Sequence, residues 1–158
     1  MMHIYSVEYE FTQHLKASAQ EAFEWCTDYK PYDLSLMKEN GLRKIRKITK
    51  DAFLLTESIS RNHRTIRKTK LVRLNRAGLS WTNTHLNGPN RNSQFLYQIL
   101  PLRKNLSRLR FKGLLIVYSK GALDEHALRQ IAKAEKEADS RAWRFLATAM
   151  SNDLRGTH

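Results

Sequence analysis

Three polar residues have the type and spacing for acid–base chemistry or ligand recognition: Glu57, Asn83 and His85. Each lies on the odd-numbered face of an alternating stretch, Glu57 within residues 52–60 and the other two within residues 79–86. If these faces point inward, burial shifts the pKa values of the glutamate and the histidine, and the three groups could orient a ligand or carry a proton. If they point outward, the same groups are ordinary polar side chains at the wet face of a sheet. The turn that follows His85 favours this second interpretation for the histidine.

Motifs for metal, nucleotide or covalent chemistry are absent from the sequence. The six histidines and the single cysteine show neither H-x-x-x-H nor C-x-x-C spacing. The chain also lacks G-x-S-x-G, the P-loop pattern and G-x-G-x-x-G. Cys26 lies beside Trp25 in an amphipathic segment, where we expect a buried, inert thiol. The sequence therefore predicts no metal site and no cofactor.

The elements that must position the polar residues are mostly strands. Residues 3–12 alternate strictly between apolar and polar side chains, as a half-buried strand does. Ser18 and Glu21 have the spacing of a capping box, which predicts a helix that ends before Pro31, and a second short helix is expected at residues 34–38. Short turns rich in Gly, Asn and Pro separate six further stretches, which predict antiparallel strands at residues 42–49, 52–60, 65–74, 79–86, 93–100 and 107–118.

A long amphipathic helix is predicted at the C-terminus, from about residue 124 to residue 152. At about 1.5 Å per residue it would be roughly 45 Å long, enough to cross the whole sheet. Its wet face would consist of charged and polar residues: Arg129, Lys133, Lys136, Ser140 and Arg144. Its buried stripe would consist of residues at steps of three and four: Ala127, Ile131, Ala134, Ala138, Ala142, Phe145 and Ala149. The chain is therefore predicted to be α+β, with the order β-α-α-β6-α.

Several segments carry a resemblance to a known family: YEF at residues 9–11, SAQEAFEW at 18–25, LLTE at 54–57, SWTNTH at 80–85 with GP at 88–89, FLY at 95–97 and LRFKG at 109–113. In these segments and in the order of its elements, the chain resembles the START-like (SRPBCC) superfamily, and within it the polyketide cyclase/dehydrase-like small proteins. The resemblance implies a single ligand-binding domain over residues 1–158 with the helix-grip fold, a seven-stranded curved antiparallel sheet wrapped around the C-terminal helix. Superfamily members share architecture more than residues, so the resemblance specifies fold better than function.

The resemblance also implies a hydrophobic cavity between helix and sheet, where superfamily members bind lipids, sterols, polyketides or plant hormones. The alanine-rich stripe would leave room for such a cavity, or it would let the helix pack close to the sheet with no void. The aromatic residues would then be cavity wall or plain core. The side chains expected to line the cavity are Tyr9, Phe11, Leu55, Glu57, Trp81, Asn83, Tyr97, Phe111, Ala138, Ala142 and Phe145.

Two functions fit this expectation. The first is the binding of a hydrophobic small molecule, lipid-like or polycyclic. The second is a cofactor-independent cyclase or dehydratase in which Glu57 or His85 carries a proton. Binding is the leading hypothesis, because no catalytic signature occurs in the sequence.

The charge of the chain suggests a third hypothesis. Lys and Arg number 28 against 15 Asp and Glu, a net charge of +13, and they cluster at residues 43–47, 61–76 and 103–112. Such a surface could bind nucleic acid, anionic lipid or the acidic head group of a ligand, although no ribonucleoprotein motif or recognition helix is present. Arg67, Lys68 and Lys70 place charge on both faces of one strand, which predicts a strand that lies at an edge of the sheet, where charges discourage aggregation, or beyond the cavity.

The sequence also suggests where the protein works. No apolar run approaches the roughly 18 residues of a membrane span, and residues 1–10 lack the apolar centre of a signal peptide. A single cysteine fits a reducing compartment. We therefore expect a cytoplasmic protein.

Overall fold

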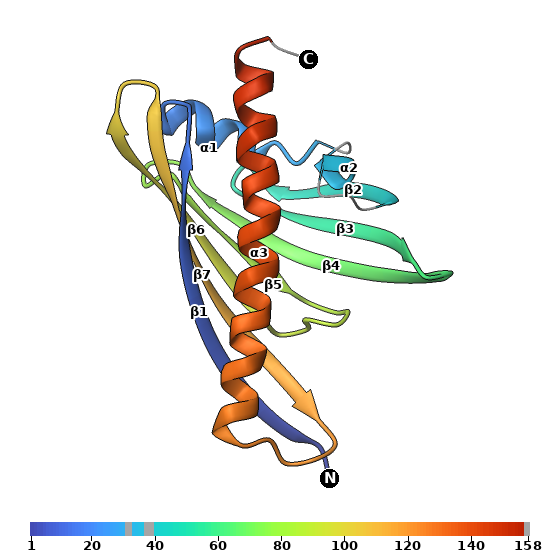
Figure 1. The fold of residues 1–158 in the computed structure, drawn as a ribbon. Helices are drawn as coiled ribbons and strands as arrows, with labels where there is room; N and C mark the ends of the chain where they lie inside the picture. Colours follow the sequence, from blue (N-terminus) through green and yellow to red (C-terminus); the bar gives the residue numbers. More distant parts are fainter. Residues whose placement is uncertain (31–32, 37–39, 157–158) are drawn as a thin grey trace.

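The computed structural model describes residues 1–30, 33–36 and 40–156. Seven strands and three helices follow one another in these ranges (Figure 1): β1 (His3–Leu15), α1 (Ala19–Thr27), α2 (Asp33–Leu36), β2 (Asn40–Thr49), β3 (Ala52–Arg61), β4 (Arg64–Asn75), β5 (Ser80–His85), β6 (Gln94–Arg103), β7 (Leu106–Ser119) and α3 (Glu125–Leu154). Residues 37 and 38, the end of the predicted second helix, and Pro31, where the first was expected to stop, lie outside the described residues.

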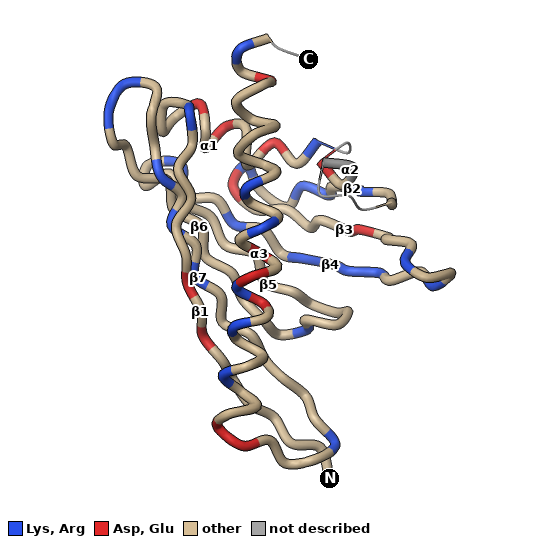
Figure 2. Tube along the Cα trace, in the orientation of Figure 1, with Lys and Arg blue, Asp and Glu red and all other residues tan. Residues whose placement is uncertain are grey.

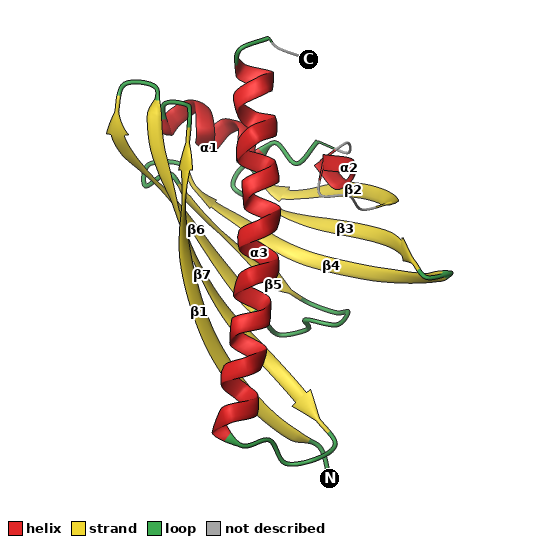
Figure 3. Cartoon of the chain, viewed as in Figure 1, coloured by secondary structure: helices red, strands yellow, loops and turns green. Residues whose placement is uncertain are grey.

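The seven strands form one antiparallel sheet in the order β1-β7-β6-β5-β4-β3-β2. Neighbouring strands from β2 to β7 are joined by short turns, while β1 pairs with β7 along its whole length, from His3 opposite Ser119 to Leu15 opposite Ser107. Asn62 and His63 both adopt positive φ, as the two-residue turn between twisted antiparallel strands requires. The sheet is strongly curved, and α3 crosses its concave side (Figure 3). The predicted α+β helix-grip fold is confirmed.

Ser18 is the N-cap of α1, as the predicted capping box requires, but the Glu21 carboxylate reaches back to the Ser18 hydroxyl. The Ser18 hydroxyl accepts a hydrogen bond from the backbone N–H of Glu21 at 3.2 Å and donates one to the Glu21 carboxylate at 2.8 Å. Near the C-terminal end of α1, the Trp25 indole N–H donates a hydrogen bond to Asp153 at 2.9 Å and so joins α1 to the end of α3. Phe23 packs edge-on against Trp81 of the sheet, with ring centroids 5.8 Å apart. Helix α1 therefore closes the sheet beside the C-terminal half of α3.

Two expectations about the elements are wrong. The charged segment that includes Lys68 and Lys70 belongs to β4, which is not an edge strand but pairs with β3 on one side and β5 on the other. Lys and Arg follow β4 along much of its length (Figure 2). The edges of the sheet are β1 and β2 instead.

The second wrong expectation concerns the buried stripe of α3. Ala134, Ala138 and Phe145 are exposed, whereas Trp143, Leu146 and Met150 are buried against the sheet. The helix is rotated by about one residue, or roughly 100°, from the predicted stripe, because three large side chains bury more apolar area than a row of alanines. The rotation brings the carboxyl groups of Glu135 and Asp139 to the sheet side. Among the described helices, none is long and apolar enough to cross a membrane.

Candidate functional site

A cavity of about 470 Å³ lies between α3 and the concave side of the sheet. Its walls come from β3, β4, β5, β6, β7 and α3, with Leu34 of α2 at one end. The volume falls in the range of small-molecule sites, roughly 300–1,000 Å³. The lining combines apolar and charged side chains, with residues Leu34, Glu57, Ile59, Arg61, Lys68, Lys70, His85, Asn90, Phe95, Tyr97, Phe111, Glu135, Ala138, Asp139, Arg141, Ala142, Trp143, Phe145 and Leu146.

One wall of the cavity is aromatic. Phe95 and Tyr97 of β6 and Phe111 of β7 share the inner face of the sheet, since Tyr97 and Phe111 are direct cross-strand partners. The Tyr97 ring meets Phe111 edge-on at 5.2 Å and Trp143 of α3 at 5.8 Å between centroids. These side chains line the cavity together, and aromatic rings favour stacked or edge-on contact with another aromatic ring.

The side chains of Trp81 and Asn83, behind this wall, hold Tyr97 in place. Trp81 stacks on the Tyr97 ring with centroids 4.8 Å apart. Asn83 donates to the Tyr97 hydroxyl at 3.4 Å and accepts from the hydroxyl of Tyr29 at 3.1 Å. Burial raises the pKa values of both tyrosines, so their hydroxyl groups stay protonated. Asn83 and Trp81 are therefore buried supports of the aromatic wall and not part of the cavity lining.

A second part of the sheet carries a row of charged side chains across β2, β3 and β4. Arg43 and Lys68 are the cross-strand partners of Glu57 on either side. The Glu57 carboxylate binds the Arg43 guanidinium at 2.8 Å and the Lys70 amine at 2.5 Å. Although burial alone would raise the pKa of Glu57, the two cations lower it to about 2. Glu57 is thus a permanently ionised, doubly paired carboxylate at neutral pH.

His85 joins the charged row to the aromatic wall. The residue is 5% exposed, and its ring meets Phe95 edge-on at 5.1 Å. Its Nδ1 atom is buried without a hydrogen-bond partner among the described residues. Burial, together with Lys70 and Lys68, lowers the pKa of His85 to about 3, so the imidazole is neutral. The outward position favoured for His85 by its neighbouring turn is wrong, because the β5–β6 loop folds back: the His85 N–H donates to the Ser93 carbonyl at 2.9 Å.

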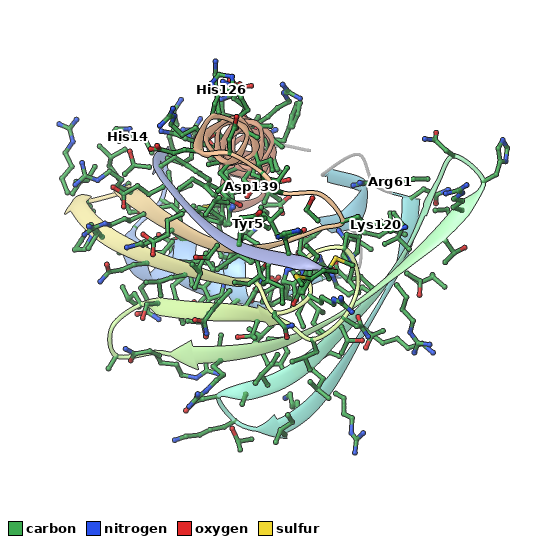
Figure 4. The ribbon with its side chains drawn as sticks, turned by 90° about the horizontal axis from the view of Figure 1, so that it is seen from below. Tyr5, His14, Arg61, Lys120, His126 and Asp139 are labelled. Atoms are coloured by element: carbon green, nitrogen blue, oxygen red, sulfur yellow. The ribbon has the colours of Figure 1, made fainter. Side chains whose placement is uncertain are left out.

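A carboxyl group that the sequence analysis missed enters the cavity from α3. Asp139 accepts a hydrogen bond at 2.5 Å from the hydroxyl of Tyr9 on β1. It lies on the side of the helix that faces the sheet, as Figure 4 shows. Burial, with Glu135 nearby, raises the pKa of Asp139 to about 6, and burial and Asp139 together raise the pKa of Tyr9. Asp139 is therefore a lining carboxyl group whose pKa lies close to neutrality.

The structure divides the predicted lining residues into two sets. Six of them line the cavity: Glu57, Tyr97, Phe111, Ala138, Ala142 and Phe145. Five lie elsewhere: Leu55, Trp81 and Asn83 are buried in the core, Tyr9 stands behind Asp139, and Phe11 stacks on Phe111 at 4.5 Å. Sequence reasoning missed Lys68, Lys70, Asp139 and Trp143. Both lysines lie on the same strand face as the buried Val72, but the charge of their segment led to the prediction of an exposed position. No cluster of three or more metal-binding side chains occurs within the described ranges.

The curved sheet, the helix across it and the cavity between them define a class of protein: the chain has the START-like, polyketide cyclase-like fold. Three solved structures illustrate the similarity. The Zhui aromatase/cyclase from a Streptomyces species is 14% identical, with a TM-score of 0.76 over 95% of this chain and 96% of its own. A START superfamily protein from Mycobacterium smegmatis is also 14% identical, with a TM-score of 0.68 over 90% and 98%.

The third structure, a protein from Thermus thermophilus, is 10% identical, with a TM-score of 0.71 over 93% of this chain and 99% of its own. No family model and no curated protein matches the sequence. At such low identities the similarity extends to the fold alone.

Proposed function

We propose that the protein binds an aromatic or polycyclic small molecule in the cavity between α3 and the sheet. The observation that carries the proposal is the volume of about 470 Å³ walled on one side by Phe95, Tyr97, Phe111 and Trp143. Ring contacts of this kind contribute about 0.5–1.5 kcal/mol each beyond the area they bury. The name of the Zhui aromatase/cyclase, a protein of the same fold, supports a ring-containing ligand.

The bound rings would contact the wall without displacing it, because its members are fixed by one another. Tyr97 is held between Trp81 and Trp143, and its hydroxyl is bound by Asn83. A wall fixed before binding loses little conformational freedom when the ligand arrives. This preorganisation favours flat, rigid ligands over flexible chains.

Binding is tested with the uncharged fluorophore N-phenyl-1-naphthylamine, titrated against the wild type and two tryptophan variants. Ala138 and Ala134 are both exposed on α3, one turn apart, but only Ala138 lines the cavity. We expect A138W to fill part of the cavity and weaken binding about tenfold, the effect of losing roughly 1.4 kcal/mol, while A134W leaves binding unchanged. Absence of saturable binding to the wild type, or equal binding by the two variants, would sink the proposal.

A second candidate function is a cofactor-independent cyclase or dehydratase. It is supported by Asp139, a cavity carboxyl group with a pKa of about 6, close to the value that suits a general acid or base at neutral pH. Glu57 and His85, with pKa values of about 2 and 3, are poorer proton carriers. In a turnover assay with a polyketide thioester analogue, D139N should abolish conversion and retain fluorophore binding. Unchanged turnover in D139N would exclude Asp139 as the proton carrier.

The proposed location is the cytoplasm. Cys26 packs against the core, and burial raises its pKa, so the thiol is protonated and unreactive. A single inert thiol supports a reducing compartment.

A further inference from the structure

Lys68 is a cation of the cavity without a counter-ion in contact. It lines the cavity from β4, where its cross-strand partner is Glu57. The Glu57 carboxylate, however, is bound by Arg43 on one oxygen and by Lys70 on the other. Among the described residues, the Lys68 amine has neither an ion pair nor a side-chain hydrogen bond. A partly buried ammonium group in this state lacks the partner that normally offsets its loss of hydration.

The loop between β5 and β6 lies beside the stem of Lys68. A Cβ atom at Gly88 would lie 3.4 Å from Lys68 Cγ, so there is no room for a larger side chain between the loop backbone and the stem. The loop is tied to β4 at Thr69, whose N–H donates to the Asn87 side chain at 2.7 Å and whose carbonyl accepts from the Leu86 N–H at 2.8 Å. The stem of Lys68 is therefore bordered by a loop that is itself anchored to β4.

Other charges around the cavity do not cancel that of Lys68. Asp139 accepts from the Tyr9 hydroxyl and, with a pKa of about 6, is mostly ionised at pH 7, but among the described residues it forms no ion pair with Lys68. Burial, Lys70 and Arg61 lower the pKa of Lys68, and the carboxylates of Glu57 and Asp139 oppose this only in part. The wall around Lys68 is consequently positive, and an anionic ligand group would gain a charge-assisted hydrogen bond there.

The cationic wall and the aromatic wall meet. Lys70 is the cross-strand partner of His85, whose ring touches Phe95, which in turn lies 5.9 Å from Phe111 between centroids. A single rigid molecule can therefore contact both walls. Its apolar rings would lie on the aromatic side and an acidic substituent on the side of Lys68.

We propose that Lys68 is the anion-binding residue of the cavity, and that the ligand is an aromatic or polycyclic acid, with a carboxylate or an ionised phenol or enol as the acidic group. The inference rests on the proposed function, because it names the chemical class of the molecule that the cavity binds. It adds a specific polar contact that the fold does not supply by itself. The ammonium of Lys68 donates to the anionic oxygen, while Lys70 stays on Glu57.

The proposal is tested with anthracene-2-carboxylate and its uncharged carboxamide, two fluorescent probes of nearly equal shape. We expect the wild type to bind the carboxylate about tenfold more tightly than the carboxamide, the effect of one charge-assisted hydrogen bond. K68M should remove this preference and keep the affinity for the carboxamide, and K68R should retain most of it. K133M, which removes one exposed charge from α3, is the control for net charge and should behave as the wild type.

The outcomes separate this proposal from the proposed function. If both probes bind the wild type equally, or if K68M retains the preference, the assignment of Lys68 is overturned while cavity binding stands. If neither probe binds, both proposals fail. Circular dichroism of K68M and K68R establishes that the variants are folded, and K68R then reports on charge with the stem kept in place.

Discussion

Glu57 shows how a buried carboxylate can be structural although its surroundings are those of an active site. Its side chain is 2% exposed and contacts Arg43 and Lys70, which come from the two neighbouring strands. Arg43 also binds Asp33 at 3.2 Å, so the pair extends to α2. The two strands and α2 are thus joined to β3 through one buried charge network, and removal of the central carboxylate would leave two cations without their shared partner.

The substitution Glu57→Gln should therefore destabilise the protein by about 3 kcal/mol, the typical cost of breaking a buried ion pair from one side. The free energy of unfolding at pH 7, measured by urea denaturation, checks this expectation. Glu137→Gln, on the exposed face of α3, is the matched control and should change stability by less than about 0.5 kcal/mol. Equal stabilities of the two variants would show that the network contributes nothing.

The same residues show what the sequence could and could not reveal. A strand has only two faces, so alternation placed Asn83 and His85 on one face of their strand and Glu57 with apolar residues on one face of another, and all three are buried as the inward alternative required. Alternation could not reveal that Glu57 forms ion pairs with Arg43 and Lys70. These two residues belong to other strands, and their charge indicated a position at the surface. The charge of a residue in a strand does not decide its exposure when the partner strand carries the opposite charge.

At the scale of elements, the prediction of α3 had the correct position and the wrong rotation. Small residues recur along the whole helix, so several stripes have the right period, and alanine distinguishes poorly between them. Trp143, Leu146 and Met150 decide the rotation by their size. The wrong rotation also hid the inward position of Asp139. Its partner could not be predicted either, because the hydroxyl of Tyr9 lies 130 positions away and is brought close only by the β1–β7 pairing and the helix crossing.

The contact between β1, β7 and α3 depends on a glycine. Gly113 is the cross-strand partner of Tyr9, and a Cβ atom there would lie 2.7 Å from Tyr9 Cζ. Gly113→Ala should therefore displace the Tyr9 ring, break its hydrogen bond to Asp139 and cost about 1–3 kcal/mol. Thermal unfolding followed by circular dichroism measures the loss. Gly121→Ala, which meets no atom within 4 Å, is the control, and an equal melting temperature for the two variants would contradict the expected clash.

At the scale of the whole molecule, two cavity groups make stability respond to pH in opposite directions. The pKa of His85 falls from 6.5 to about 3 on folding, so the unfolded chain binds more protons and stability is lost as pH drops through this window. The pKa of Asp139 rises from 3.8 to about 6, so the folded chain binds more protons and stability is lost as pH rises through that window. Between about pH 6 and pH 4 the two contributions oppose each other.

Single substitutions should separate these contributions. Relative to the wild type, Asp139→Asn should gain stability progressively as pH rises from about 4 to about 6, because the variant no longer has to bury an ionised carboxylate. His85→Phe, which keeps a ring against Phe95, should gain relative stability in the opposite direction, as pH falls from about 6.5 toward 4. Urea denaturation at half-unit steps between pH 7 and pH 4 gives both difference curves. A flat difference curve for either variant would mean that its group has the same pKa in the folded and unfolded chains, and that the cavity does not exclude its charged form. Burial is the main cause of the lowered pKa of His85, and Lys70 and Lys68 add to it. Saturation with an aromatic carboxylate bound at Lys68 should therefore make the wild-type minus His85→Phe curve less steep without abolishing its slope.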